Sequence, residues 1–142
     1  MEAPVKSFRQ ELLFQTREAE EAIDITAECE KALKESGIRE GLCLVFPLHT
    51  SACVFISDSD PGVAEDFRDL LARLAPQGAG YRHDRADPKH NAHSHLRASL
   101  AGHHITCPVT RGAFDFGTYH TIYYLELDGQ RKKEVLIKIV GE

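Results

Sequence analysis

The spacing of apolar residues along the chain predicts strands and helices that alternate without a regular repeat. Loose alternation over residues 5–16, with Phe8, Leu12 and Phe14 as its apolar members, predicts a first strand. A run of apolar residues at 42–46 indicates a strand buried on both faces, which ends at Pro47. Further strands are predicted over 52–56, 104–109, 119–127 and 134–140. Asp128-Gly129 predicts a hairpin turn between the last two strands.

Apolar residues at helical spacing predict three helices. The first is capped by Asp24 or Thr26, the second begins at Pro61, and the third spans 92–101 with Asn91 as its N-cap. The positions expected to face the core are Ile25, Cys29, Ala32 and Leu33 in the first, Val63, Phe67, Leu70, Leu71 and Leu74 in the second, and Leu96 and Leu100 in the third. Together with the closing strands, these helices predict an α+β fold with a mainly antiparallel sheet and helices packed on it.

Length and composition narrow this picture to one compact domain over residues 1–142. The chain has 142 residues, of which 42% are hydrophobic and 27% charged, as expected for a globular protein. A net charge of -5 without a basic stripe argues against a nucleic-acid partner. The chain shows neither the start of a signal peptide nor an apolar run of the ~20 residues that cross a bilayer, so we expect a cytoplasmic protein without a membrane partner. The four cysteines form no Cys-x-x-Cys pair and are expected to be reduced and buried.

Histidines concentrate in one stretch of the sequence. Six of the eight lie between Tyr81 and His104, together with Asp84, Asp87 and Asn91. Neutral imidazole is the commonest side-chain metal ligand, and histidine is the side chain that changes charge most easily near neutral pH. We expect this stretch to form one wall of a site. The other wall is expected to be the segment 49–51, which follows a predicted strand.

Three histidines from separate elements, with an open fourth position, are typical of a catalytic zinc site. The candidate ligands are His49, His83 and His95, with His90 and His93 as alternatives. Asp84 is the first candidate to orient an imidazole as a hydrogen-bond acceptor. The spacing matches no diagnostic motif such as His-Glu-x-x-His, so histidines that only serve the surface or the core are the alternative interpretation.

Residues beside the histidines suggest the ligand and the chemistry. Arg82, Lys89 and Arg97 would suit an anionic, phosphorylated ligand, although cations are also common on any solvated loop. Asp58 is a candidate for acid–base chemistry, whereas Asp60 is expected to cap a helix. Thr50 and Ser51 offer hydroxyls that could bind phosphate or orient His49. The side chains of 117–120, with Thr118 and His120 among them, open a strand after a glycine turn and could reach the cleft.

Four ordered motifs resemble the YjbQ-like family, whose members are often called secondary thiamine-phosphate synthases. The motifs are His49-Thr50-Ser51-Ala52 followed by an acidic turn and Asp60-Pro61, then Tyr81-Arg82-His83-Asp84, then Asn91 with His95-Leu96-Arg97-Ala98-Ser99, and finally Gly117-Thr118-Tyr119-His120. The chain departs from the family pattern at two places. The turn is Ser-Asp-Ser where the family has Asn-Glu-Asn, and Tyr119-His120 replaces Trp-Gln.

The resemblance implies an α+β subunit that assembles as a homotrimer, with histidines grouped in a cleft that often holds a metal. It selects His49, His83 and His95 out of the eight histidines as the ligands of this divalent metal. Three imidazoles favour zinc, with magnesium as the alternative. It also implies a thiamine-phosphate synthase-like transferase, in which Asp58, His49 and Thr50 act in catalysis. A small phosphorylated metabolite would contact Arg82, Asn91, Arg97, Thr118 and His120.

Two other functions are compatible with the same residues. Three imidazoles favour zinc-activated water over the magnesium that usually assists departure of pyrophosphate, so a metal-dependent hydrolase of a phosphorylated metabolite is one alternative. A trimer that binds a metal or a metabolite without catalysis is the other.

Overall fold

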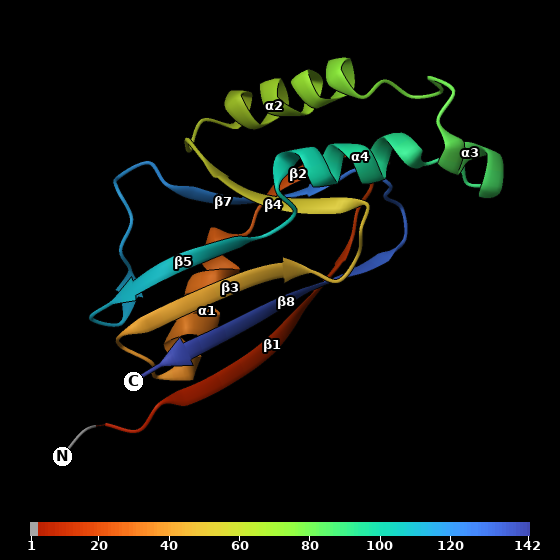
Figure 1. Ribbon diagram of the computed structural model, residues 1–142. Coiled ribbons are helices and arrows are strands. Elements are labelled where there is room, and N and C mark those ends of the chain that lie inside the picture. The colour runs from red at the N-terminus through yellow and green to blue at the C-terminus, as the bar shows by residue number, and fades with distance from the viewer. Residues whose placement is uncertain (1–2) are drawn as a thin grey trace.

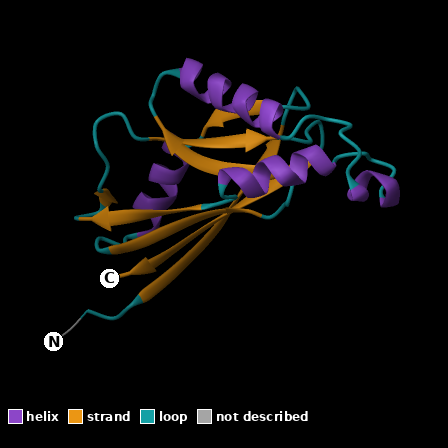
Figure 2. Cartoon of the chain, turned by 45° about the horizontal axis from the view of Figure 1, so that its top comes forward, coloured by secondary structure: helices purple, strands orange, loops and turns teal. Residues whose placement is uncertain are grey.

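The computed structural model describes residues 3–142, so the first two residues of the predicted domain lie outside it. Its strands form two antiparallel sheets, which Figure 2 shows splaying apart. The larger sheet has the order β1-β8-β3-β5-β6 and the smaller has the order β2-β7-β4. The strands are β1 (Lys6–Gln15), β2 (Glu21–Asp24), β3 (Gly41–Pro47), β4 (Ala52–Ser57), β5 (Ile105–Thr110), β6 (Ala113–Phe114), β7 (Thr121–Glu126) and β8 (Lys132–Gly141).

The described part of the chain also contains four helices: α1 (Thr26–Ser36), α2 (Pro61–Leu74), α3 (Arg82–Ala86) and α4 (Ala92–Ala101). Helix α1 contacts strands of both sheets, whereas α2 and α4 lie together on the far side of the smaller sheet (Figure 1). The predicted α+β class with mainly antiparallel strands is therefore confirmed. The structure also adds α3 and the short β6, which the periodicity does not predict.

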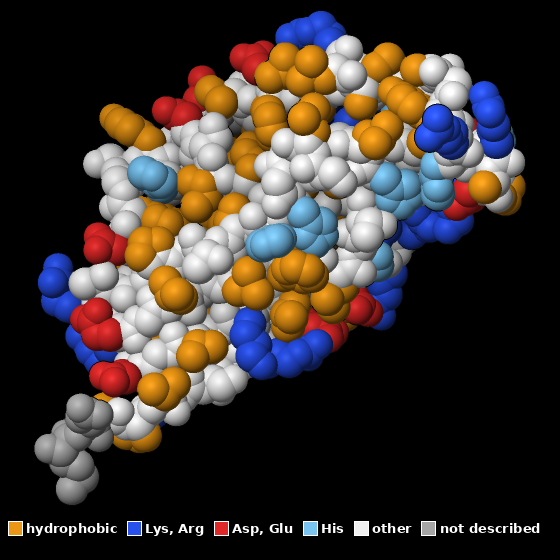
Figure 3. Space-filling model, in the orientation of Figure 1, with side chains coloured by type: hydrophobic (Ala, Val, Ile, Leu, Met, Phe, Trp, Pro, Cys, Tyr) orange, Lys and Arg blue, Asp and Glu red, His pale blue; other side chains and the backbone are white. Residues whose placement is uncertain are grey.

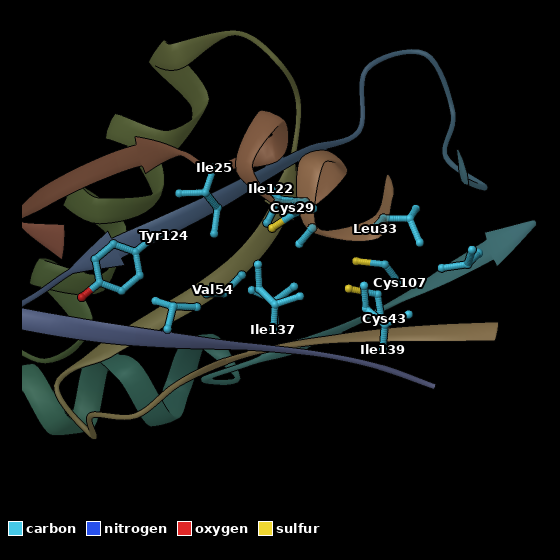
Figure 4. Close-up of a cluster of buried hydrophobic side chains, with 14 of the residues drawn as sticks. Ile25, Cys29, Leu33, Cys43, Val54, Cys107, Ile122, Tyr124, Ile137 and Ile139 are labelled. Atoms are coloured by element: carbon cyan, nitrogen blue, oxygen red, sulfur yellow. The ribbon is translucent and has the colours of Figure 1, made fainter. Parts of the chain in front are cut away.

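The main core lies between the two sheets and α1. Its fully buried members include Ile25 and Cys29 of the helix side, Val54 and Tyr124 of the smaller sheet, and Ile137 of the larger one (Figure 4). A second cluster fills the other face of the smaller sheet against α2 and α4. Because the smaller sheet is covered on both sides, all six residues of β7 are buried. The prediction of buried, unpaired cysteines is confirmed, since all four are free thiols inside the protein.

The predicted hairpin between the last two strands is wrong. Strand β7 pairs with β2 and β4, whereas β8 pairs with β1 and β3 in the other sheet. The turn after β7 leads the chain from the smaller sheet to the larger one. Hydrogen bonds hold this turn in place: the carboxylate of Glu126 accepts the N–H groups of Leu127 and Asp128, and the N–H of Gly129 donates to Ala19 O. The turn signal was therefore real, but it does not join paired strands.

Several apolar positions predicted to face the core are exposed. Leu70 and Leu74 of α2 are 41% and 60% exposed, and Leu96 and Leu100 of α4 are 45% and 58% exposed. The helices instead bury smaller residues such as Ala64 and Ala98 against the smaller sheet. Strand β3 is also buried on one face only, since Leu42 is 57% exposed while its neighbours in the alternation are buried. The positions of helices and strands were predicted well. Which of their apolar faces are buried by other elements was not.

Candidate functional site

The two walls predicted from the sequence do meet. The turn between β3 and β4 supplies His49, Thr50 and Ser51, and the segment from α3 to α4 supplies His83 and His95. These residues line one cavity of about 480 Å³, which we call the histidine cleft. Pro47 ends β3 beside it, and Asp84 of α3 accepts the Ala92 N–H at 3.0 Å, which secures the start of α4. Asp84 therefore serves the helix, and among residues 3–142 its carboxylate orients no imidazole through a hydrogen bond.

His83 and His95 form the centre of the cleft. Their rings meet edge to face with centroids 4.9 Å apart. Thr50 Oγ1 is hydrogen-bonded to His95 Nδ1 at 3.0 Å. Because a hydroxyl and an imidazole in hydrogen-bond contact can exchange a proton, Thr50 and His95 could deliver or accept one at a bound ligand.

Asn91 fixes the orientation of His83 from behind. Its Nδ2 donates to Asp128 Oδ2 at 2.8 Å, so its Oδ1 is left to accept from His83 Nε2 at 3.1 Å. In the neutral ring the proton is then on Nε2, and Nδ1 of His83 is the free acceptor. Asn91 is buried and occupies the N-cap position of α4, as predicted, but its side chain caps no backbone N–H.

His49 lines the same cleft but is bonded to the sheet. Its Nε2 accepts the backbone N–H of Glu134 at 3.0 Å, and its carbonyl accepts from His103 Nε2 at 3.0 Å. Burial lowers the pKa of His49 below 6.5, and the charge of Lys133 contributes in the same direction. His49 is therefore neutral near pH 7 and connects the turn after β3 to β8.

The predicted three-histidine metal site does not fit this arrangement. Nε2 of His49 is occupied by the Glu134 N–H, which leaves only His83 and His95 side by side. Within residues 3–142, no three His, Cys, Asp or Glu side chains stand close enough to hold a metal ion. We therefore assign no step to a metal.

Cations dominate the cleft. Arg131, Lys132, Lys133 and Lys89 line it with the three histidines, while Asp87 is the one carboxylate among the described lining residues. The pKa of Asp87 is lowered because its carboxylate accepts the Lys89 N–H at 2.9 Å, so it is ionised. Figure 3 shows histidines and Lys or Arg side chains gathered near the end of the molecule that carries α3.

Lys133 reaches the cleft from the interior and was missed by sequence reasoning. It is 3% exposed, and its Nζ contacts Glu126 Oε2 at 3.0 Å and Ser51 Oγ at 3.3 Å. Glu126 is fully buried and also accepts from the hydroxyl of Tyr124 at 2.8 Å. Burial and the neighbouring Glu126 raise the pKa of Tyr124, which keeps its hydroxyl protonated as a donor. The basic run after the Asp128-Gly129 turn was the available signal.

Other predicted site residues lie elsewhere. Arg82 lines an adjoining, mostly apolar cavity that shares Thr50, His83 and His95 with the cleft. Arg97 is buried and bonded to Glu20 and to Ala75 O, away from the cleft lining.

Asp58 and His120 line a separate cavity of about 280 Å³ beside the start of α2. Asp58 Oδ1 accepts the Asp60 N–H, and His120 Nδ1 accepts the Gly117 N–H. Thr118 is exposed in the same loop as His120. Within one chain these residues do not reach the histidine cleft.

The fold and the cleft together define a small α+β protein with a cationic, histidine-lined site. The chain belongs to the UPF0047 YjbQ-like family, because the family described as UPF0047 protein YjbQ-like matches residues 10–142. A UPF0047 protein of Archaeoglobus fulgidus is 38% identical over 128 residues, covering 90% of this chain and 98% of that protein. Another, from Methanothermobacter thermautotrophicus, is 37% identical over 135 residues and covers 95% and 93%.

Solved structures agree with the fold. A YbjQ-like protein of unknown function from Sulfolobus solfataricus P2 superimposes with a TM-score of 0.92 at 30% identity, covering 98% of this chain and all of the other. A YjbQ/UPF0047 protein from Clostridium acetobutylicum gives a TM-score of 0.84 at 34% identity, with coverages of 92% and 98%. The resemblance seen in the sequence is confirmed.

These findings correct the predicted function. The thiamine-phosphate synthase-like transferase with a metal-binding cleft is wrong, because the matching proteins carry no such activity in their descriptions and the similar structure is of unknown function. The metal-dependent hydrolase and the metal-holding form of the binding trimer depended on the same ligand set and are not retained. Separately, none of the helices in residues 3–142 has the length and apolar character needed to cross a membrane.

Two histidines, the partly buried His49 and the buried His93, make stability depend on pH. Burial lowers the pKa of both His49 and His93, so the unfolded chain binds more protons than the folded one below pH 6.5. We expect the free energy of unfolding to be highest above pH 6.5 and to fall as the pH drops through 6.5 toward the lowered pKa values. Urea unfolding at pH 7.5 and pH 5.5 would measure this difference.

His49→Gln is expected to reduce this pH dependence, because glutamine can accept the Glu134 N–H but does not titrate. His90→Asn, at an exposed histidine, is the matched control and should leave the difference unchanged. Equal unfolding midpoints at both pH values in the unmodified protein would contradict the expectation.

Proposed function

We propose that the protein binds a small phosphorylated metabolite, with the phosphate in the histidine cleft. The observation that carries this proposal is the charge of the cleft lining. Arg131 and Lys133 are paired with Asp128 and Glu126, whereas Lys89 and Lys132 form no ion pair within residues 3–142. With His83 and His95 they face one carboxylate among the described lining residues, Asp87, in a chain of net charge -5. A concentration of cations against the overall charge favours an anionic ligand.

The hydrogen-bond donors of the cleft suit phosphate oxygens. Thr50 is exposed and bonded to His95, so its hydroxyl and the imidazole act as a pair. Lys132 and Lys89 are exposed at the rim and form no ion pair within residues 3–142, which leaves their charge available. Charge-assisted hydrogen bonds from such groups to phosphate oxygens are stronger than neutral ones.

Titration with inorganic phosphate, followed by the amide resonances of the protein, tests this proposal. We expect His95→Gln and Lys132→Gln each to weaken phosphate binding by at least about tenfold, because a hydrogen bond to a charged group contributes roughly 1.5–3 kcal/mol. His104→Gln, at an exposed histidine outside the cleft, should bind as the unmodified protein does. Phosphate affinity that is unchanged in both cleft variants would contradict the proposal.

The homotrimer, the divalent metal and the cytoplasmic location stay predictions. Exposed apolar side chains support self-association: Leu42 and Val140 pair across the outer face of the larger sheet, at 57% and 43% exposure. Zinc, or magnesium as the alternative, would need a ligand set other than the three predicted histidines.

A further inference from the structure

A second cavity of about 490 Å³ adjoins the histidine cleft. We call it the far pocket. It lies between the β1–β2 connection, which supplies Glu18, and the start of α4, which supplies His93. Lys89 and Asn91 line both cavities. The two cavities therefore meet at these two residues.

His93 of the far pocket has a buried ring nitrogen without a hydrogen-bond partner among the described residues. It is 8% exposed, and its Nδ1 has no hydrogen-bond partner within residues 3–142. Buried polar atoms in native proteins nearly always have a partner, so an orphan at a cavity wall indicates a missing one. Burial lowers the pKa of His93, and the nearby Arg97 acts in the same direction. The ring is neutral near pH 7 and has one donor and one acceptor nitrogen.

The remaining groups of the far pocket carry both signs of charge. Glu18 is exposed and its carboxylate makes no ion pair or hydrogen bond with the described residues, while Lys89 and Arg68 face the same space. Glu20 and Asp128 are already engaged by Arg97 and Arg131. A cavity with cations, carboxylates and a neutral imidazole is poorly suited to a simple cation or an apolar group. It suits hydroxyl groups, which donate and accept at once.

We infer that the ligand is a phosphorylated polyol, whose phosphate lies in the histidine cleft and whose hydroxyls lie in the far pocket against His93 and Glu18. This inference rests on the proposed function and narrows it to a class of metabolite. The far pocket provides the specificity, because a hydroxyl that satisfies the buried imidazole gains a contact that inorganic phosphate cannot make.

The test compares ribose 5-phosphate with inorganic phosphate by calorimetric or resonance titration. We expect the unmodified protein to bind ribose 5-phosphate at least about tenfold more tightly, as one or two additional hydrogen bonds imply. His93→Phe and Glu18→Gln should each reduce this advantage to less than about threefold while leaving the affinity for inorganic phosphate unchanged. Glu30→Gln, an exposed carboxylate on α1, is the matched control and should keep the full advantage.

The outcomes separate the inference from the function beneath it. Phosphate binding without any advantage for ribose 5-phosphate would overturn the polyol inference and leave the proposed function standing. An advantage that survives both substitutions would also overturn it, because the hydroxyls would then lie elsewhere. If neither compound binds, the proposed function fails and the inference fails with it. Glu18 is exposed, so its variant reports on the ligand even if His93→Phe disturbs folding.

Discussion

Replacing Lys133 with methionine is expected to lower the free energy of unfolding by about 3–5 kcal/mol, because it leaves the fully buried carboxylate of Glu126 without its counter-charge. The total stability of a domain of this kind is roughly 5–15 kcal/mol, so the loss would be a large part of it. Tyr124 and two backbone N–H groups would still donate to the carboxylate, but none of them carries a positive charge. Urea unfolding followed by circular dichroism would measure the change.

Two further variants isolate the cause. Lys132→Met changes the preceding, exposed lysine and should shift stability by no more than about 0.5 kcal/mol. The double variant Glu126→Gln, Lys133→Met removes both charges and should recover much of the loss, because replacing a buried ion pair as a whole is often close to neutral. A Lys133→Met protein as stable as the Lys132→Met control would show that Glu126 does not depend on the ammonium group.

The same pair connects stability to the cleft. Lys133 reaches Ser51 Oγ as well as Glu126, so one buried cation joins the turn after β3 to the strands behind it. His49 adds a second connection from that turn to β8 through the Glu134 N–H. Thr50 lies between His49 and Ser51, so these contacts hold its hydroxyl in position opposite His95. Polar contacts therefore support the wall of the cleft that carries Thr50 on both sides.

Local patterns in the sequence predicted most of the helices and strands. The third helix was placed at residues 92–101 and α4 spans the same residues, with Asn91 at its N-cap position and Gly102 at its C-cap. Gly37 and Gly102 end their helices in the left-handed conformation, which glycine adopts without strain. Such features depend only on neighbouring residues, so a single sequence contains them.

Long-range relations were predicted less well. The alternation of apolar residues along β7 and β8 does not reveal which strands they pair with. The turn between them suggested that they pair with one another, whereas they lie in different sheets. Helical spacing likewise predicts which face of a helix is apolar, but not whether another element packs on that face. Leu96 and Leu100 lie on a face of α4 that is exposed. Tertiary packing decides both questions, and its information is spread over distant residues.

The histidine cleft was predicted only in part, because some of its contacts are also long-range. His83 and His95 are close in sequence and meet through the short connection between α3 and α4. The segment 49–51 was expected to form the second wall of the site, and Thr50 Oγ1 lies 3.0 Å from His95 Nδ1, 45 residues further along the chain. Lys133 was missed because a lysine in an alternating strand ordinarily faces solvent, and only the buried Glu126 reverses that expectation.

Close packing of two backbones makes Gly41 as sensitive as a core residue. Gly41 of β3 pairs directly with Gly141 of β8, and a Cβ added at Gly41 would lie 2.1 Å from the carbonyl oxygen of Val140 and 2.8 Å from the Cα of Gly141. Both neighbours are backbone atoms, so a rotamer change cannot relieve the contact. The strands would have to separate locally.

Gly41→Ala is therefore expected to lower the free energy of unfolding by about 1–3 kcal/mol, the usual cost of inserting atoms into a packed region. With a urea dependence of roughly 1–3 kcal/mol per molar, the unfolding midpoint should fall by about 1 M. Gly62→Ala, in the first turn of α2, meets only the flexible carboxylate of Asp60 at 3.3 Å and should change the midpoint little. Equal midpoints for the two alanine variants would mean that β3 and β8 do not approach so closely, and the register of the larger sheet would then need revision.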